Sequence, residues 1–168
     1  PDPGERNAFR STSYHNTVTV NGLEQNSFDN GLLFSLGNES RARTTSWHTA
    51  SDRDEFKGEH AGFAQRGFHH ARSIRYEKSG QRVIILDEVI GDRPRSTASF
   101  HLRPGAKLIE VGPGSYRIDG VTISFTGHRS IEVVDAWHSV EYGRRVKNRC
   151  LKVNFEERLE TRISRAAA

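Results

Sequence analysis

The chain has 168 residues, a length that suits one domain with one core and excludes two full-sized domains. A hydrophobic fraction of 34%, 15 glycines and no methionine disfavour a helical bundle and favour short strands joined by turns. With 25 Lys and Arg against 21 Asp and Glu, the net charge of +4 suits acidic partners but does not distinguish nucleic acid, acidic polysaccharide and anionic membrane.

Cysteine usage and the start of the chain set further bounds. The single cysteine, Cys150, excludes an internal disulfide and a zinc site built on cysteines. No apolar run approaches the ~20 residues of a membrane helix, so we expect no membrane span. The sequence begins with Pro1 and lacks the pattern of a secretory signal, and we interpret it as a segment of a longer chain.

Short runs of alternating apolar and polar residues predict strands along most of the chain. Residues 17–20 form the first run, and the Asn21-Gly22 dipeptide after it predicts a hairpin turn. Further strands are predicted at 32–36, 73–76, 82–90, 99–102, 107–111, 116–118, 121–125, 131–134 and 151–155. Strands of this length and spacing predict an all-β fold, an antiparallel two-sheet β-sandwich with little helix.

Three segments in the middle of the chain have distinct patterns. Residues 38–68 are polar and rich in glycine, and we expect long loops there, with one or two strands around Trp47 and residues 61–64. Residues 83–86 are apolar on both faces, which predicts a central strand covered on both sides. Gly127 is expected to form a turn between two separate strands.

Histidine is the residue type with the most chemical potential in this sequence. The chain contains eight histidines, but none belongs to a compact metal motif, and His69 and His70 would point to opposite faces of a strand. His15 stands out because it directly precedes a half-buried strand and has Asn16 beside it. A histidine fixed at such a junction suits a metal ligand or a sugar contact.

Residues 5–18 read Glu-Arg-Asn-Ala-Phe-Arg-Ser-Thr-Ser-Tyr-His-Asn-Thr-Val, which resembles the opening of the second domain of heparinase II/III-like polysaccharide lyases. Further matching motifs follow in order: Val20-Asn21-Gly22-x-Glu24-Gln25, Glu59-His60-x-Gly62-Phe63, His70-x-Arg72-Ser73-Ile74, Val83-Ile84-Ile85-x-Asp87-Glu88-Val89-x-Gly91 and Phe100-His101-Leu102-x-Pro104-Gly105. The resemblance covers residues 5–105 with named motifs, and the remainder fits by strand pattern.

This resemblance implies a fold and an activity. Residues 1–168 would form a single supersandwich-like β-sandwich domain, the C-terminal part of a chain whose N-terminal (α/α) toroid and first sandwich strands are missing. The parent protein would be a secreted or periplasmic bacterial lyase that degrades acidic, uronate-containing polysaccharide by β-elimination in the cleft between toroid and sandwich. The 168 residues alone are expected to be inactive, and nucleic acid is not expected as a partner.

The resemblance also implies roles for residues near the start of the chain. His15 would be one ligand of a zinc ion whose other ligands lie upstream, and Arg10, Tyr14 and Asn16 would contact the substrate. Asp2-Pro3-Gly4 resembles a family metal-binding segment but lies closer to His15 than the family pattern implies, so we interpret it as a turn. No catalytic residue is assigned within these 168 residues.

The remaining polar and aromatic candidates are interpreted as structural. They are His60 in a glycine-flanked loop, His70 and Arg72 on one strand face, Asp87-Glu88 at a strand end, the two tryptophans Trp47 and Trp137 in a core or interdomain role, and the basic residues 144–149 on a solvated strand edge. Two alternatives to the lyase remain open. One is a non-catalytic carbohydrate-binding sandwich involved in exopolysaccharide handling, and the other is a structural sandwich without a ligand.

Overall fold

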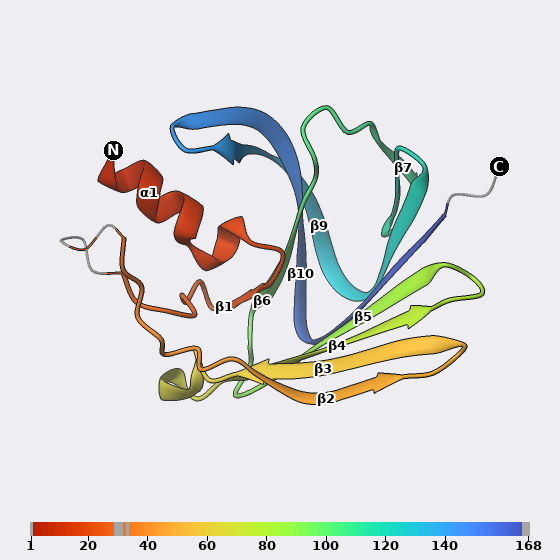
Figure 1. The fold of residues 1–168 in the computed structure, drawn as a ribbon, viewed down its shortest axis with the longest axis horizontal. Coiled ribbons are helices and arrows are strands. Elements are labelled where there is room, and N and C mark those ends of the chain that lie inside the picture. Colours follow the sequence, from red (N-terminus) through yellow and green to blue (C-terminus); the bar gives the residue numbers. More distant parts are fainter. Residues whose placement is uncertain (1, 29–31, 33, 166–168) are drawn as a thin grey trace.

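The computed structural model describes residues 2–28, 32 and 34–165 and is drawn in Figure 1. One α-helix opens this part of the chain, and strands with two short 3₁₀ turns make up most of the rest. The elements are α1 (Pro3–Arg10), η1 (Thr12–Tyr14), β1 (Val18–Val20), β2 (Arg43–Thr49), β3 (Arg53–His60), η2 (Ala64–Arg66), β4 (His69–Glu77), β5 (Arg82–Ile90), β6 (Ser96–His101), β7 (Leu108–Gly112), β8 (Ser115–Ile118), β9 (Val121–Glu141) and β10 (Arg144–Arg165).

The long strand β10 joins two layers of the sandwich because it changes its pairing partner halfway along. Residues 150–155 of β10 pair with β6, which in turn pairs with β1. Residues 158–163 pair instead with β5, the first of the series β5, β4, β3 and β2. On its other edge β10 pairs with β9 along nearly its whole length, so both long strands pass from one layer into the other (Figure 1). All pairings are antiparallel, and the predicted sandwich is confirmed.

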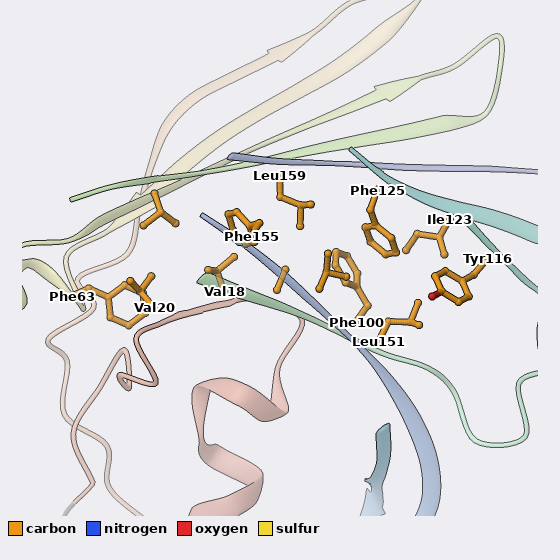
Figure 2. Packing of buried hydrophobic residues seen from close by; sticks show 13 residues of the cluster. Val18, Val20, Phe63, Phe100, Tyr116, Ile123, Phe125, Leu151, Phe155 and Leu159 are labelled. Carbon is orange, nitrogen blue, oxygen red and sulfur yellow. The ribbon is translucent and has the colours of Figure 1, made fainter. Parts of the chain in front are cut away.

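The core lies between the two layers and is built from alternate side chains of the central strands (Figure 2). Its members include Val18, Val20, Ala98, Phe100, Ile123, Phe125, Leu151, Val153, Phe155 and Leu159. The rings of Phe100 and Phe125 lie 5.2 Å apart between centroids, so residues from β6 and β9 meet directly. Each fully buried side chain of this size contributes about 1.5–3 kcal/mol, which makes this shared core the main source of cohesion between the layers.

Several predicted strands are confirmed, but β9 differs from the prediction at Gly127. The hairpin around Asp119-Gly120 forms as β8 and β9, and the strand predicted at 107–111 forms one residue later as β7. Gly127 does not separate two strands, since β9 runs without interruption from Val121 to Glu141. At Gly127 the backbone φ is +90°, and the pairing with β10 shifts register nearby, so the residue forms a bulge within one strand.

The Asn21-Gly22 hairpin and the 32–36 strand were also wrong predictions. The turn exists, but β1 pairs with β6, whose residues lie far along the chain, and not with the segment that follows the turn. Asn21 supports this pairing by exchanging hydrogen bonds with Arg95, at 2.9 and 3.0 Å. Leu32, Phe34 and Leu36 lie outside any strand and are exposed, while residue 33 lies outside the described residues.

Residues 38–68 carry more regular structure than their polar composition predicts. The expected strand around Trp47 is β2, but β3 was not predicted, and residues 61–64 lead into the η2 turn. Every residue of β2 is exposed, and Trp47 itself is 69% exposed, so it does not belong to the core, and of its two expected roles the interdomain one stays a prediction. With neither strand offering a buried face, the sequence lacks the alternation that identifies a strand.

The structure corrects two further predictions, the burial of residues 83–86 and the turn at Asp2-Pro3-Gly4. Residues 83–86 lie in a central strand, flanked by β4 and β10, but their side chains are only half-buried. Asp2-Pro3-Gly4 is not a turn but the start of α1, where the Asp2 carboxylate accepts a hydrogen bond from the Gly4 N–H at 2.7 Å. No helix within the described ranges is long and apolar enough to cross a membrane.

Candidate functional site

His15 lies in the short link between the η1 turn and β1, with its side chain exposed. Its backbone is fixed on both sides, because the His15 N–H donates to the Thr12 carbonyl at 3.2 Å and its own carbonyl accepts from the Thr17 N–H at 2.8 Å. The following strand is anchored by Val18, which is fully buried. The link therefore presents an imidazole to solvent from a backbone that is held firmly.

Asn16 connects this link to both layers of the sandwich. Its side-chain Oδ1 accepts a hydrogen bond from the His101 N–H on β6 at 2.8 Å. Its backbone carbonyl accepts a hydrogen bond from Arg72 Nη1 on β4 at 2.7 Å. Asn16 was predicted to contact substrate, and the contacts it makes within the chain hold the residue beside His15 in place.

Arg72 owes its position to a buried carboxylate on the neighbouring strand. Asp87 is fully buried, and its two oxygens accept hydrogen bonds from Arg72 Nε at 2.7 Å and Nη2 at 3.1 Å. Asp87 Oδ1 also accepts from His70 Nε2 at 2.8 Å. Burial opposes ionisation of Asp87, but the hydrogen bond from His70 and the charge of Arg72 outweigh it and hold the pKa of this carboxyl below its usual value.

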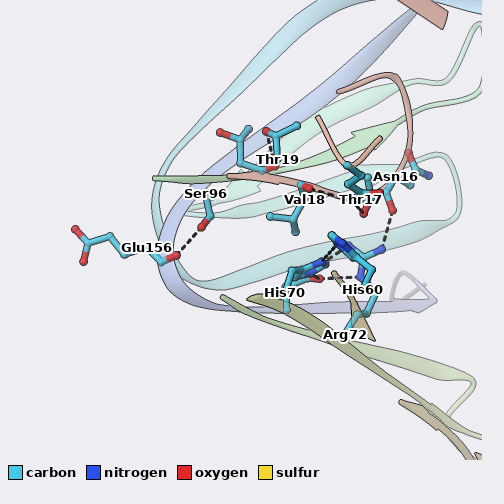
Figure 3. A network of polar contacts seen from close by, with 12 residues as sticks. Asn16, Thr17, Val18, Thr19, His60, His70, Arg72, Ser96 and Glu156 are labelled. Carbon is cyan, nitrogen blue, oxygen red and sulfur yellow. Dashed lines mark hydrogen bonds and ion pairs between the residues drawn. The ribbon is translucent and has the colours of Figure 1, made fainter. Parts of the chain in front are cut away.

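Two histidines extend this network with defined tautomers (Figure 3). His60 Nδ1 accepts from the Gly62 N–H at 3.2 Å, so the proton of neutral His60 resides on Nε2. That Nε2–H donates to His70 Nδ1 at 3.0 Å, and His70 then donates through its own Nε2–H to Asp87. Burial, the largest cause, and the nearby positive charge of Arg72 lower the pKa of His60 to about 4, which keeps it neutral.

The hydrogen bonds within this network indicate a structural role. Each ring nitrogen of His60 and His70 and both oxygens of Asp87 already have a hydrogen-bond partner within the chain. A buried, fully satisfied charge of this kind holds its partners rigidly, and removing one partner is strongly destabilising. We therefore assign the network to fixing the His15–Asn16 link, through Arg72, and not to proton transfer with a substrate.

Arg10 and Tyr14, the other predicted substrate contacts, also make contacts within the chain. Arg10 Nη1 donates to the Ser35 carbonyl at 2.7 Å, and its guanidinium lies 5.0 Å from the centre of the Phe28 ring. The Tyr14 ring stacks on His101, with 5.6 Å between centroids. Arg10 therefore contacts residues 28 and 35, and Tyr14 contacts β6.

A small cavity brings two of the four predicted residues together. It has a volume of about 130 Å³ and contains both His15 and Arg10, whereas Tyr14 and Asn16 are not part of its wall. The other lining residues are Thr12, Glu24, Gln25, Asn26, Phe28 and Leu36. Glu24 is held in this wall by the hydrogen bond that it accepts from the Thr12 N–H at 2.6 Å.

The fit of a metal ion to His15 depends on residues that this part of the chain does not supply. Among residues 2–28, 32 and 34–165, no three His, Cys, Asp or Glu side chains gather in an arrangement that could hold a metal. His15 offers one exposed imidazole, so it can supply one ligand to a site completed from elsewhere, and it does not form a zinc site by itself.

The basic residues at the start of β10 are engaged with neighbouring elements. Arg145 forms an ion pair with Glu5 of α1 at 2.5 Å, and its guanidinium lies 4.4 Å from the centre of the Trp137 ring. Arg149 Nη2 donates to the Ala106 carbonyl at 3.0 Å. These residues therefore connect α1 and the 102–106 loop to β10, whereas the sequence predicted only a solvated strand edge.

The assembly of His60, His70, Arg72 and Asp87 was missed by sequence reasoning, although each residue was named separately. Asp87 was placed at a strand end, which is wrong, because it lies inside β5 directly opposite Arg72 of β4. His60 likewise ends β3 opposite His70. The available signal was the hairpin centred near Gly80, because counting back equally from that turn aligns the two strands so that Arg72 faces Asp87.

Comparisons with known proteins agree with this architecture. A family model described as "Heparinase II/III-like, C-terminal" matches residues 2–165. The fold is similar to a heparinase III, the BT4657 gene product, with a TM-score of 0.77 and 19% identity over 98% of this chain and 25% of that one. It is also similar to a mutant of the heparan sulfate lyase HepC from Pedobacter heparinus, with a TM-score of 0.76 and 14% identity over 98% of this chain and 26% of that one. No curated protein matches the chain.

Proposed function

The chain belongs to the heparinase II/III-like family, as its C-terminal β-sandwich domain, and from this premise we propose that it is part of a lyase that cleaves uronate-containing polysaccharide by β-elimination. The chain spans about a quarter of the length of the solved lyases that it resembles. In our proposal the remaining groups come from an N-terminal (α/α) toroid that faces the side of the sandwich carrying His15.

The chemistry of β-elimination explains why a second domain is needed. The reaction must neutralise the uronate carboxylate, remove the proton at C5 and protonate the O4 leaving group, so it needs several groups that converge on one sugar. Within the sandwich, the single observation that carries the proposal is the doubly anchored link that presents His15 beside a cavity. In the network of His60, His70 and Asp87, each ring nitrogen and each carboxylate oxygen already has a hydrogen-bond partner within the chain. We therefore expect the catalytic base and the catalytic acid to come from the toroid.

The activity test compares the longer protein with the isolated sandwich. The longer protein should convert at least one acidic polymer, such as heparan sulfate, alginate or hyaluronan, into products with the ultraviolet absorbance of a C4–C5 unsaturated uronate. Residues 1–168 alone should give no such signal. Turnover by residues 1–168 alone would overturn the two-domain proposal, and glycan binding by the longer protein without turnover would favour a carbohydrate-binding module.

We further propose that His15 is one ligand of a zinc ion whose other ligands lie outside these residues. Zinc in such a site would hold His15 against the part of the protein that supplies the other ligands. His15→Ala should therefore reduce the zinc content of the longer protein to background in elemental analysis. His48→Ala, a change at an exposed histidine of β2, should leave the zinc content unaltered. Full zinc content in the His15 variant would contradict the assignment.

A polymeric, acidic substrate also suits a particular location. Acidic polysaccharides are encountered outside the cytoplasm, so we propose a secreted or periplasmic protein. The single cysteine of these 168 residues is buried, so its thiol is shielded from the oxidants of such a compartment.

A further inference from the structure

A larger cavity lies next to the one that contains His15. It has a volume of about 490 Å³ and is enclosed by residues 23–27, by Glu39 and Arg41, and by the turn around η2. The charged side chains in its lining are Glu24, Glu39, Arg41 and Arg66. A volume of this order falls within the range of small-molecule sites, which combine apolar surface with a few polar groups, as this lining does.

The walls of this cavity are held in place before any ligand binds. Glu39 accepts hydrogen bonds from the Ser27 hydroxyl at 2.5 Å and from the Ser27 N–H at 3.1 Å. Gly62 lies so close to the opposite wall that a Cβ there would meet the Gln25 carbonyl oxygen at 2.5 Å. The hydrogen bond from the Gly62 N–H to His60 fixes the same turn from behind. A preorganised pocket of this kind loses little entropy on binding.

Two cations in the lining are available for an anionic ligand. Arg41 and Arg66 are exposed, and neither takes part in an ion pair with any residue in the described ranges. The two lining carboxylates are already bound to the chain, Glu24 to the Thr12 N–H and Glu39 to Ser27. The cavity therefore presents free guanidinium groups beside carboxylates that are engaged in its walls.

The backbone at Arg41 supports a functional role for that residue. Its φ is +39°, in the left-handed region that residues with a side chain rarely adopt. Such a conformation is strained and is found preferentially at functional positions. A glycine would relieve the strain but would remove the guanidinium.

The position of the cavity relative to His15 indicates which molecule it would bind. Glu24, Gln25 and Asn26 line both this cavity and the smaller one that holds His15 and Arg10, so the two are neighbours. A polysaccharide that reaches His15 can therefore place another of its sugar units in the larger cavity. Guanidinium groups bind carboxylate and sulfate through paired hydrogen bonds.

We infer that this cavity is a subsite for an anionic sugar unit, bound through its carboxylate or sulfate by Arg41 and Arg66, one step along the polymer from the unit at His15. The inference rests on the proposed function, since that function supplies the acidic polymer. It adds the residues that would select acidic over neutral chains.

The test uses Arg41→Gln, Arg66→Gln and the double variant of the longer protein. The matched control is Arg117→Gln, which removes an exposed arginine from β8, outside the cavity. Binding is measured calorimetrically with a heparin-derived tetrasaccharide, an alginate tetrasaccharide and neutral cellotetraose, and KM and kcat are measured on the polymer that is cleaved. Because hydrogen bonds to charged groups are worth ~1.5–3 kcal/mol, each single variant should raise Kd and KM about tenfold or more. kcat should change less than Kd and KM.

Different results separate the subsite from the proposed function. If the unaltered protein binds neither acidic tetrasaccharide, or if the double variant binds and turns over acidic chains as the control does, the subsite is wrong even where lyase activity is present. Equal losses of binding for cellotetraose and the acidic probes would also overturn the recognition of charge. If the arginine variants lose acidic tetrasaccharide binding in a protein that cleaves no uronate polymer, the subsite holds and the lyase proposal fails.

Discussion

At the scale of single residues, the charge of Asp87 organises much of the molecule around His15. A fully buried carboxylate is costly unless its neighbours neutralise and hydrogen-bond it. Arg72 and His70 both donate hydrogen bonds to Asp87. Arg72 also donates to the Asn16 carbonyl, and His70 accepts a hydrogen bond from His60. The backbone next to the exposed His15 is thus held in place, through Arg72, by a carboxylate that is fully buried.

His60 makes the stability of this network depend on pH. In the folded protein its pKa is about 4, against an ordinary value of 6.5, so between these values the unfolded chain binds a proton that the folded chain does not. Stability from this group is therefore complete above pH 6.5 and is lost as the pH falls toward 4. We expect the free energy of unfolding, measured in urea, to decline over this window with the uptake of up to one proton assigned to His60.

His60→Gln isolates that contribution. Glutamine can accept from the Gly62 N–H and donate to His70 but does not titrate, so the decline in stability between pH 6.5 and 4 should be shallower in the variant. His48→Gln on the exposed strand β2 should keep the slope of the unaltered protein. An identical pH profile in the His60 variant would show that the low pKa of His60 does not contribute to folding stability.

At the scale of elements, β9 and β10 carry the architecture because they belong to both layers. Such a passage needs a local bend, and Gly127 provides one in β9. Its φ of +90° favours glycine, and a Cβ at this position would meet the Arg158 carbonyl oxygen of β10 at 2.6 Å. Arg158 is also where β10 begins to pair with β5. The bulge and the change of partner therefore occur at the same place.

Gly127→Ala should be much more harmful than an alanine elsewhere in the same hairpin. The strained φ alone costs about 1–3 kcal/mol, and the contact with the Arg158 carbonyl adds to it, so the variant should unfold at clearly lower denaturant concentration. Gly120→Ala is the matched control, because nothing lies within 4 Å of a Cβ there. Equal stability of the two variants would mean that the bulge tolerates a side chain and is not required for the bend.

The elements also explain how much of the fold and site the sequence allowed us to predict. The β8–β9 hairpin was predictable because an Asp-Gly turn and two alternating arms gave consistent signals. β3 was not, because its polar side chains are only partly buried and carry no alternation. His15 and Arg10 line the same small cavity and are close in sequence, while their predicted roles stay predictions. The His60–Asp87 network depends on strand register across two hairpins, which composition and local pattern do not fix.

At the scale of the whole molecule, the candidate site lies where the two layers are tied together. Asn16 receives one hydrogen bond from β6 in the first layer and one from β4 in the second. The cavity of His15 and the larger cavity beside it share the 24–26 segment. A polymer bound there would contact residues that depend on both layers, so its affinity should respond to any change in the way the layers pack.

The central place of β10 has a consequence for biosynthesis. β1 gains its hydrogen-bonded partner only through β6, and both β6 and β5 use β10 as their second neighbour. Pairings between such distant segments form slowly and only after the whole segment is available. While residues 144–165 remain inside the ribosome, the edges of β5 and β6 are exposed, and the nascent sandwich is open to aggregation. The link that carries His15 is therefore made early but should acquire its final geometry among the last parts of the domain.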